Sequence, residues 1–473
     1  MADYRTATTP SVTLVSIRPS AQPIEVRFDA PSVTSDGGLP WVRAADDAVG
    51  VCLAMSACIN DSRRSATTRH SVLELLRQRI YQIVCGYEDQ NDADLLREDP
   101  LFELVCGRDP VFDAERAALA SQPTLSRLEN SVGRRECYAL SLALADLYIQ
   151  ERTRAAPNGQ VQRVRLDFDS TADPVHGSQE GEAYNGHYRE HIYHPLLCYD
   201  ADTGDLITAI LRPGSVGAKR GVVAVLKRLV ARLRRAWPGV QIELRADAGF
   251  ACPELYDYCE AQSIPYSIGF GTNERLAKLA APLLAEAQAK HAALVERLRS
   301  EGKPDEAAQA KVRLIGETPY KARRWKRERR VVIKAEVLPE GPNVRYAVTS
   351  YREPKPEAVY DDYVDRGQAE LYIKDFKRAL KADRLSCHRF LANQFRLLLD
   401  AAAYAIFQKL RRWLKGTVLA RVQMDTLRLR LIKIGGWVER RGRRVILHLS
   451  DSYPWQAVWT HLAQTAQPAS LAA

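Results

Sequence analysis

The chain has 473 residues, 46% of them hydrophobic, and 68 Lys and Arg against 58 Asp and Glu give it a net charge of +10. This length exceeds one hydrophobic core and the apolar content is that of folded protein, so several folded units are predicted and a disordered tail is excluded. The positive charge favours a polyanionic partner. No apolar run is long enough to span a bilayer, and the nine cysteines include no CxxC pair, so we expect a soluble cytoplasmic protein with buried thiols and no membrane contact.

The first third of the chain is expected to be mainly helical. Strand-like segments at 12–17 and 24–28 come first, and apolar residues then recur at helical intervals in 72–84 and 137–148. We predict that residues 1–155 form a mainly helical region that binds DNA, although plain helix packing explains the same pattern equally well.

Residues 156–272 are predicted to form the first part of an α/β core, a mixed sheet with helices. Their apolar pattern gives the order strand, strand, strand, helix, strand, helix, strand, which is the order of ribonuclease-H-like folds. In such folds, acids at the ends of two neighbouring strands meet an acid on a later helix. Alternation places Asp167 and Asp169 on one face of the first strand, and a later strand ends at Asp247.

Residues 273–354 are predicted to be an insertion into this core, made of a helical hairpin and basic strands. Its run at 320–330 carries seven basic residues and one acid. One such run is more often solvated surface, but two further basic regions in the chain favour contact with phosphate backbones. The residues expected there are Arg323, Arg324 and Lys326, and Trp325 offers a ring for stacking on an exposed base.

The core is expected to resume in 355–415 with a helix, and residues 416–473 are predicted to be a small C-terminal unit. Four polar residues of this helix fall at intervals of three, four and seven: Tyr363, Arg366, Glu370 and Lys377. Those intervals place them within about 60° of one another on one helical face. In an isolated helix, such a stripe is most simply a solvated face with salt bridges.

Three carboxylates favour another interpretation. Asp169 and Asp247 end two strands, and Glu370 completes a set that only tertiary folding can bring together. Mg²⁺ and Mn²⁺ prefer such oxygen ligands, and two ions about 3.5–4 Å apart can activate an attacking oxygen and stabilise a leaving one. The sequence therefore predicts a two-metal site for phosphoryl transfer, with Arg366 and Lys377 beside substrate phosphate.

Several blocks of the sequence point to one family. They are DFDSTADPVHGSQEG at 167–181, LRPGS at 211–215, RADAGF at 245–250 and the run at 366–397. Together with the spacing Tyr-x2-Arg-x3-Glu-x6-Lys, they resemble DDE transposases of bacterial insertion sequences. Within that superfamily, the chain looks most like the insertion-sequence 1380 family.

The resemblance implies a metal-binding triad of Asp169, Asp247 and Glu370, holding two Mg²⁺ or Mn²⁺ ions. Asp169 is preferred to Asp167 because related enzymes carry Asp-x-Ser/Thr at this strand end, as this chain does. Asp167 points to the same side of the strand, so it stays open as the true ligand or as a supporting partner.

The resemblance also implies contacts with DNA. Tyr363, Arg366 and Lys377 would lie near the phosphate at the cleaved end, and Trp325 would stack on a flipped base. The implied activity is that of a DNA transposase, which binds the terminal inverted repeats of its element, cleaves the ends and joins them to target DNA. Two ends must meet, so we expect a homodimer on double-stranded DNA, associated with the bacterial nucleoid in the cytoplasm.

Three other functions compete with this one. A relative that binds DNA without catalysis could act as a transposition inhibitor, but all three acids are present. A non-transposing ribonuclease-H-like nuclease would share the same site. His187, Glu190 and His191 match the zinc-peptidase pattern HxxEH, but that chemistry needs a helix, and the surrounding residues predict a strand.

Overall fold

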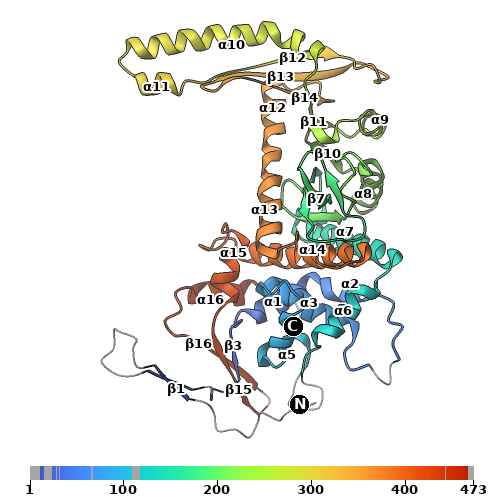
Figure 1. Cartoon of the computed structure of the whole chain (residues 1–473), viewed down its shortest axis with the longest axis vertical. Coiled ribbons are helices and arrows are strands. Elements are labelled where there is room, and N and C mark those ends of the chain that lie inside the picture. Colours follow the sequence, from blue (N-terminus) through green and yellow to red (C-terminus); the bar gives the residue numbers. More distant parts are fainter. Residues whose placement is uncertain are drawn as a thin grey trace. The chain divides into compact units, whose positions relative to one another are not determined.

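The computed structural model describes residues 11–14, 24–27, 29–30, 32–64, 68–108, 118–442 and 444–466. These residues fall into two compact units, and Figure 1 traces the chain through them by colour. Described residues within 1–45, 63–125 and 410–473 belong to the first unit, and those within 46–62 and 126–409 belong to the second. The predicted DNA-binding region, 1–155, thus contributes to both units, and parts of it lie outside the described residues.

The first unit combines helices with two small sheets. Its elements are β1 (Ser11–Leu14), β2 (Ile24–Arg27), β3 (Val33–Thr34), α3 (Val72–Cys85), α4 (Asp92–Leu95), α5 (Pro100–Cys106), α15 (Met424–Leu427), a π-helix (Arg428–Ile432), β15 (Gly436–Arg441), β16 (Arg444–Leu449) and α16 (Gln456–Thr465). Helix α3 begins at a capping box between Ser71 and Glu74 and ends at Gly86, whose φ of 94° suits glycine. Three helices have residues in both units: α1 (Leu39–Val49), α6 (Gln122–Ser131) and α14 (Phe390–Trp413).

The last part of the chain folds together with the first part. The Gly37 amide donates to the Ile434 carbonyl at 2.7 Å, and the Lys433 ammonium lies 2.8 Å from the buried carboxylate of Asp36. Strand β15 pairs with β3 as well as with β16. The segment 416–473, predicted to be a small unit by itself, therefore shares a compact unit with N-terminal residues.

A mixed sheet of eight strands forms the centre of the second unit. Its order is β12 (Val312–Tyr320), β13 (Arg329–Leu338), β14 (Gly341–Thr349), β11 (Tyr266–Phe270), β10 (Gln241–Ala246), β4 (Arg163–Ser170), β8 (Leu196–Asp200) and β9 (Leu206–Ile210). Strand β10 is parallel to both β4 and β11, and the other neighbours are antiparallel. A smaller sheet has the order β5 (Asp173–Pro174), β7 (Glu190–Tyr193), β6 (Ala183–Asn185).

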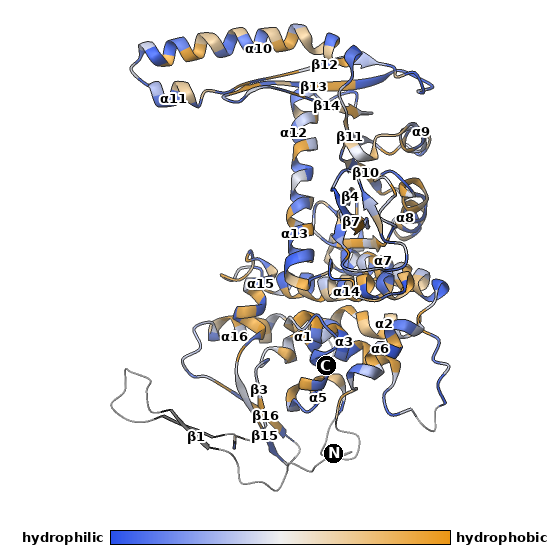
Figure 2. Ribbon diagram, in the orientation of Figure 1, coloured by the Kyte–Doolittle hydropathy of each residue, from blue (hydrophilic) through white to orange (hydrophobic). Residues whose placement is uncertain are grey.

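Helices pack around this sheet to form the core. They are α2 (Val51–Ser56), α7 (Arg134–Ala155), α8 (Val222–Ala236), α9 (Pro253–Ala261), α10 (Glu274–Ser300), α11 (Pro304–Ala308), α12 (Pro356–Val364) and α13 (Gln368–Leu380). Buried apolar residues of β4 and α8, such as Leu166 and Leu226, belong to one large cluster, and α14 is largely hydrophobic (Figure 2). Within the central sheet, the order predicted for 156–272 is found as β4, β8, β9, α8, β10, α9 and β11, but the same segment also contains β5, β6 and β7 of the smaller sheet, which the prediction lacked.

The segment 273–354 extends the same sheet. Strand β14 pairs with β11, with Ser267 opposite Thr349, and β13 and β12 follow outward. Helix α10 runs along β12 and β13 (Figure 1), with Ala287 buried against Ala335 and Val337. The helical hairpin and basic strands that the sequence predicted are thus attached to the core through backbone hydrogen bonds. Among the described residues, no helix has the length and apolar character needed to cross a bilayer.

We expect Glu103 of α5 to make the stability of the protein depend on pH. Burial raises the pKa of this carboxyl to about 7, so the folded chain holds a proton that the unfolded chain releases near pH 4.5. The free energy of unfolding should therefore fall as pH rises from about 4.5 to 7. Glu103→Gln removes this loss and should be more stable than the wild type at pH 8 by up to about 2–3 kcal/mol.

Urea unfolding of both proteins at pH 5 and pH 8 measures the difference. Glu98→Gln is the comparison: it removes a nearby carboxylate whose charge adds to the raised pKa of Glu103, so it should keep the main effect of burial and most of the pH dependence. An equal pH dependence in the wild type and Glu103→Gln would contradict the assignment.

Candidate catalytic site at the end of the parallel strands

Two adjacent parallel strands bring Asp169 and Asp247 to the same edge of the sheet. Ala246 of β10 is in register with Phe168 of β4, so the next residue along each strand is one of the two acids. Asp169 accepts a hydrogen bond from the Ser170 amide at 2.8 Å. Asp247 ends β10 and accepts one from the Gly249 amide at 2.8 Å, which caps the 3-10 turn Ala248–Phe250. Each carboxylate is therefore held by a backbone amide that follows it by one or two residues.

Asp167 lies on the same strand but has a different partner. It is completely buried, and each of its two oxygens accepts a hydrogen bond from the Arg245 guanidinium at 2.8 Å. Arg245 also donates to the carbonyl of Asp362 in α12 at 2.6 Å. The two-point pair with Arg245 occupies both oxygens of Asp167, whereas Asp169 faces the helix that carries Glu370.

The predicted helix is two helices joined by a turn. Helix α12 ends at Val364, a 3-10 turn covers Asp365–Gly367, and α13 begins at Gln368. Figure 1 shows α12 and α13 as one continuous column. From the turn, Arg366 reaches Asp169 at 3.1 Å and Glu370 at 3.6 Å. Arg366 thereby links the strand-end acid to the acid on the helix.

The three acids share one electrostatic neighbourhood. Burial raises the pKa of Asp169 to about 6, Arg366 opposes that rise, and Asp247 and Glu370 add to it. The side chain of Asp169 is 10% exposed and that of Glu370 is 70% exposed, so the helix acid faces solvent. Like charges this close need a cation, and Arg366 supplies it in this structure.

Their donor chemistry fits a hard divalent ion, since every donor is a carboxylate oxygen. As the side chains lie, no three His, Cys, Asp or Glu in the described part of the chain stand close enough to surround a metal ion. The structure puts Asp169 and Asp247 at the same end of adjacent parallel strands and links Asp169 to Glu370 through the Arg366 guanidinium.

Tyr363 packs against the backbone beside Asp247. A methyl group placed on Gly269 of β11 would overlap the Tyr363 hydroxyl and lie 2.8 Å from the Ala248 amide nitrogen, so only glycine fits there. The Arg366 guanidinium lies 6.0 Å from the centre of the Tyr363 ring, within range of a cation–π contact. Tyr363 therefore joins the acids and Arg366, as its spacing predicted.

Lys377 has local partners on the segment that follows β4. Its ammonium donates to the Thr171 hydroxyl at 3.2 Å and the Ala172 carbonyl at 2.5 Å, and lies 3.6 Å from the buried carboxylate of Asp173. A second acid, Asp383, also lies 3.6 Å away. In this structure Lys377 attaches α13 to the end of β4, and a phosphate contact would have to compete with these partners.

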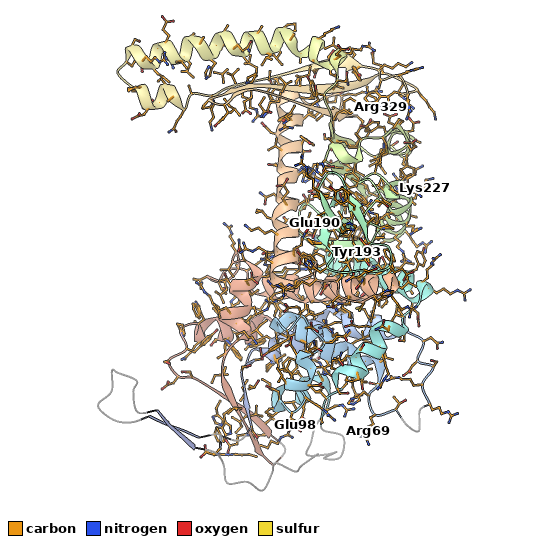
Figure 3. All side chains as sticks on the ribbon, in the orientation of Figure 1. Arg69, Glu98, Glu190, Tyr193, Lys227 and Arg329 are labelled. Carbon is orange, nitrogen blue, oxygen red and sulfur yellow. The ribbon has the colours of Figure 1, made fainter. Side chains whose placement is uncertain are left out.

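The aromatic candidate of the basic run is buried. Trp325 is 5% exposed, and its ring packs 5.3–5.6 Å from the rings of Tyr256, Phe270 and Tyr320. The guanidinium of Arg329, labelled in Figure 3, lies 5.1 Å from the Trp325 ring. Stacking on a flipped base does not fit this burial, because Trp325 would have to leave its cluster.

The neighbouring cations of the run are on the surface. Arg323, Arg324 and Lys326 are exposed, and Lys326 lies 3.1 Å from Asp257 of α9. The structure shows no hydrogen bond or ion pair between these three side chains and the acid site within the described residues. Their predicted role at DNA phosphates stays a prediction.

The HxxEH segment lacks the helix that a zinc peptidase needs. Glu190 and His191 begin strand β7, on which Figure 3 labels Glu190 and Tyr193, and His191 pairs with Glu182 at 2.6 Å. The interpretation of this segment as a zinc-peptidase site is therefore wrong.

Burial and the charges of Asp169 and Asp247 raise the pKa of Tyr188, which places this tyrosine near the acids. Sequence reasoning missed Tyr188 and Gly269, although Tyr188 lies inside the motif.

The fold and the site define an α/β protein with a cluster of acids at the end of its parallel strands. Residues 18–471 match the family described as Transposase DDE domain group 1, and the chain belongs to that family. DDE transposases generally use divalent metal ions. A cryo-EM structure of the piggyBac transposase synaptic complex with hairpin DNA is similar, with a TM-score of 0.41 and 11% identity over 84% of this chain and 79% of that chain. Among curated proteins, none matches the chain.

We expect the contact between Lys377 and Asp173 to stabilise the connection between α13 and β4. Lys377→Met leaves the Asp173 carboxylate buried without its cation, so the free energy of unfolding should fall by roughly 2–4 kcal/mol. Adding Asp173→Asn removes the uncompensated charge and should restore most of the loss. Urea unfolding of the two single variants and the double variant measures the coupling, and a double variant no more stable than Lys377→Met would contradict it.

Proposed function

We propose that this chain is a DNA transposase that binds the terminal inverted repeats of an insertion sequence, cleaves its ends and joins them to target DNA. The observation that supports the proposal is the position of Asp169 and Asp247 at adjacent parallel strand ends, with Arg366 in ion pairs with both Asp169 and Glu370. Family membership over nearly the whole chain supports it. The sequence blocks described above favour the insertion-sequence 1380 family as the group.

The strand order supports a ribonuclease-H-like core. Five adjacent strands run β9, β8, β4, β10, β11, which is the order 3-2-1-4-5 when they are numbered along the chain. Strand β8 is antiparallel to β4, whereas β10 and β11 are parallel to it. Strands 1 and 4 of this numbering are β4 and β10. The acids at their ends, Asp169 and Asp247, then lie at neighbouring strand ends, and Glu370 comes from a later helix.

Each group of the site has a chemical role in the proposed reaction. Asp169, Asp247 and Glu370 would hold two Mg²⁺ or Mn²⁺ ions, which would supply activation of the attacking oxygen and stabilisation of the leaving one. Arg366 and the hydroxyl of Tyr363 would bind the reacting phosphate through charge-assisted hydrogen bonds. The proposed nucleophile is water in end cleavage and the freed 3′-hydroxyl in joining. The proposed partner is double-stranded DNA, held by a homodimer when two ends are joined.

We expect the acids Asp247 and Glu370 to be needed for cleavage and dispensable for binding. Asp247→Asn and Glu370→Gln keep side-chain size but remove a charge that a metal ion needs, so end cleavage in Mg²⁺ should fall by on the order of 10²-fold or more. Affinity for a duplex carrying the end of the element should be unchanged within about twofold, since phosphate contacts provide most of it.

Cleavage on a sequencing gel and fluorescence anisotropy measure the two properties. Glu357→Gln is the matched control, because Glu357 is an exposed acid in the first turn of α12. Full cleavage by Glu370→Gln would remove Glu370 from the proposed site.

A second pair of variants separates the two acids of β4. Asp169→Asn should abolish cleavage and should lower the free energy of unfolding less than Asp167→Asn does, because Arg366 keeps Glu370 as a second carboxylate partner. Asp167→Asn leaves the buried Arg245 guanidinium without its carboxylate, so its main effect should be a loss of about 3–5 kcal/mol in the free energy of unfolding. A stable Asp167→Asn variant without cleavage would instead make Asp167 the metal ligand.

A further inference from the structure

A cationic hollow lies at the C-terminal end of α13. Its volume is about 350 Å³. Five of its six lining residues carry positive charge, and the full set is Lys374, Lys377, Arg378, Lys381, Asp383 and Arg384. We call this set the α13 hollow. Among its members, only Lys377 belongs to the residues discussed for catalysis above.

Three of the cations of the α13 hollow have no partner that balances their charge within the described residues. Its one acid, Asp383, lies 3.6 Å from Lys377, which also lies 3.6 Å from Asp173. Within the described part of the chain, the side chains of Lys374, Arg378 and Lys381 make no hydrogen bond or ion pair. Three cations around one hollow repel each other, and an anion entering it would relieve that repulsion.

The backbone makes a sharp turn directly after α13, next to the hollow. Helix α13 ends at Leu380, and Lys381 follows with φ 57° and ψ 33°, a left-handed conformation that is usually given to glycine at a helix end. The Arg384 amide then bonds the Lys381 carbonyl at 2.8 Å. This turn brings residues from beyond the helix to the hollow, at the cost of a strained lysine.

Favourable interaction with the helix dipole explains only part of this arrangement. Cations in the last turn of a helix are stabilised by the partial negative charge there, which accounts for Lys377 and Arg378. It does not account for Lys374, which lies before the last turn of α13 and lines the same hollow. A binding site for an anion accounts for all of these positions.

The hollow lies on the side of α13 that carries the catalytic acid. Glu370, Lys374, Lys377 and Lys381 follow one another at intervals of four, three and four residues. The first three are residues of α13, and their intervals keep them on one helical face, while Lys381 follows directly after the helix. Figure 2 shows hydrophilic residues along α13. At 1.5 Å per residue, Lys381 lies about 16 Å along the axis from Glu370. That length equals about five base-pair steps of 3.4 Å.

We propose that the α13 hollow binds a backbone phosphate of the DNA whose reacting phosphate lies at the three acids, an inference that rests on the proposed function. Arg378 offers a planar fork that matches two phosphate oxygens, and Lys374 and Lys381 offer point charges. The contact fixes the register of the duplex along α13 and carries no sequence information.

The test measures how DNA binding depends on salt. A fluorescent duplex of 30 base pairs is titrated with the full chain in EDTA, at several KCl concentrations, so that no cleavage occurs. The proteins compared are the wild type, Arg378→Gln and the triple variant Lys374→Gln/Arg378→Gln/Lys381→Gln. Each lost phosphate contact should lower the slope of log K against log[salt] by about 0.9. Arg378→Gln should therefore lower it by about 1, and the triple variant should bind at least tenfold more weakly near 0.1 M salt.

Arg235→Gln is the matched control. Arg235 is also an exposed arginine in the last turn of a helix, α8, and it lies outside the hollow. Its removal should leave the slope unchanged. Thermal unfolding midpoints within a few degrees of the wild type show that the variants are folded. A triple variant with the wild-type slope would overturn the proposal.

Two further measurements separate the possible failures. Calorimetric titration with inorganic phosphate tests for a site that takes only the free ion. If the triple variant loses phosphate binding but keeps the wild-type salt slope for DNA, the proposed DNA contact is overturned. Glu370→Gln tests the proposed activity independently, because cleavage is measured in Mg²⁺ and binding in EDTA. A wild type that binds no DNA would overturn both proposals. If Glu370→Gln loses cleavage while Arg378→Gln keeps the wild-type salt slope, only the proposed phosphate contact of the α13 hollow is overturned.

Discussion

The site depends on the ion pair between Arg366 and Asp169. Asp169 is almost fully buried at the end of β4, close enough to Asp247 and Glu370 for their charges to raise its pKa. Without a cation, ionised carboxylates in this position would repel each other in a poorly solvated place. Arg366 lies between Asp169 and Glu370, so one side chain both neutralises the acids and joins the sheet to the helix.

Two other ion pairs attach the same helical column to the neighbourhood of β4. Arg245, paired with Asp167, reaches Asp362 of α12, and Lys377 of α13 reaches Asp173 just after β4. Arg366 lies in the turn between the helices. Contacts from α12, from this turn and from α13 therefore set the position of both helices against the sheet. Pairs as buried as these add little net stability compared with apolar packing, but each is costly to leave half made. They therefore favour one register of the helices over others, and that register brings Glu370 towards the strand-end acids.

The sequence predicted the parts of the site that follow from local periodicity. Alternation predicted that Asp167 and Asp169 belong to one strand, and both lie in β4. Spacing placed Arg366 and Glu370 on one face of a helix, whereas Arg366 lies in the 3-10 turn before α13 and still contacts Glu370 at 3.6 Å. Neither pattern could show that Asp167 pairs with Arg245 and Asp169 with Arg366, because each arginine is distant in sequence from its partner.

Burial was the second property that local patterns could not reveal. Trp325 lies in a run of cations that is typical of an exposed surface, yet tertiary packing buries its ring among other aromatic side chains. The segment 273–354 was similarly predicted as an insertion, and only strand pairing shows that β14, β13 and β12 continue the central sheet. The small sheet that holds Tyr188 near the acids depends on long-range pairing in the same way.

The charges along α13 divide into two groups by their partners. Arg366, Glu370 and Lys377 have internal partners, which hold the helix against β4 and the residues after it. The side chains of Lys374, Arg378 and Lys381 make no ion pair within the described residues, although they belong to the same helix and its end. A cation with an internal partner gains little from a second anion, since the first pairing would have to be broken, whereas an unpaired cation gains the whole interaction. The structure thus distinguishes cations that would have to leave an internal partner to bind a phosphate from cations that need no such change, a distinction that the spacing Tyr-x2-Arg-x3-Glu-x6-Lys does not make.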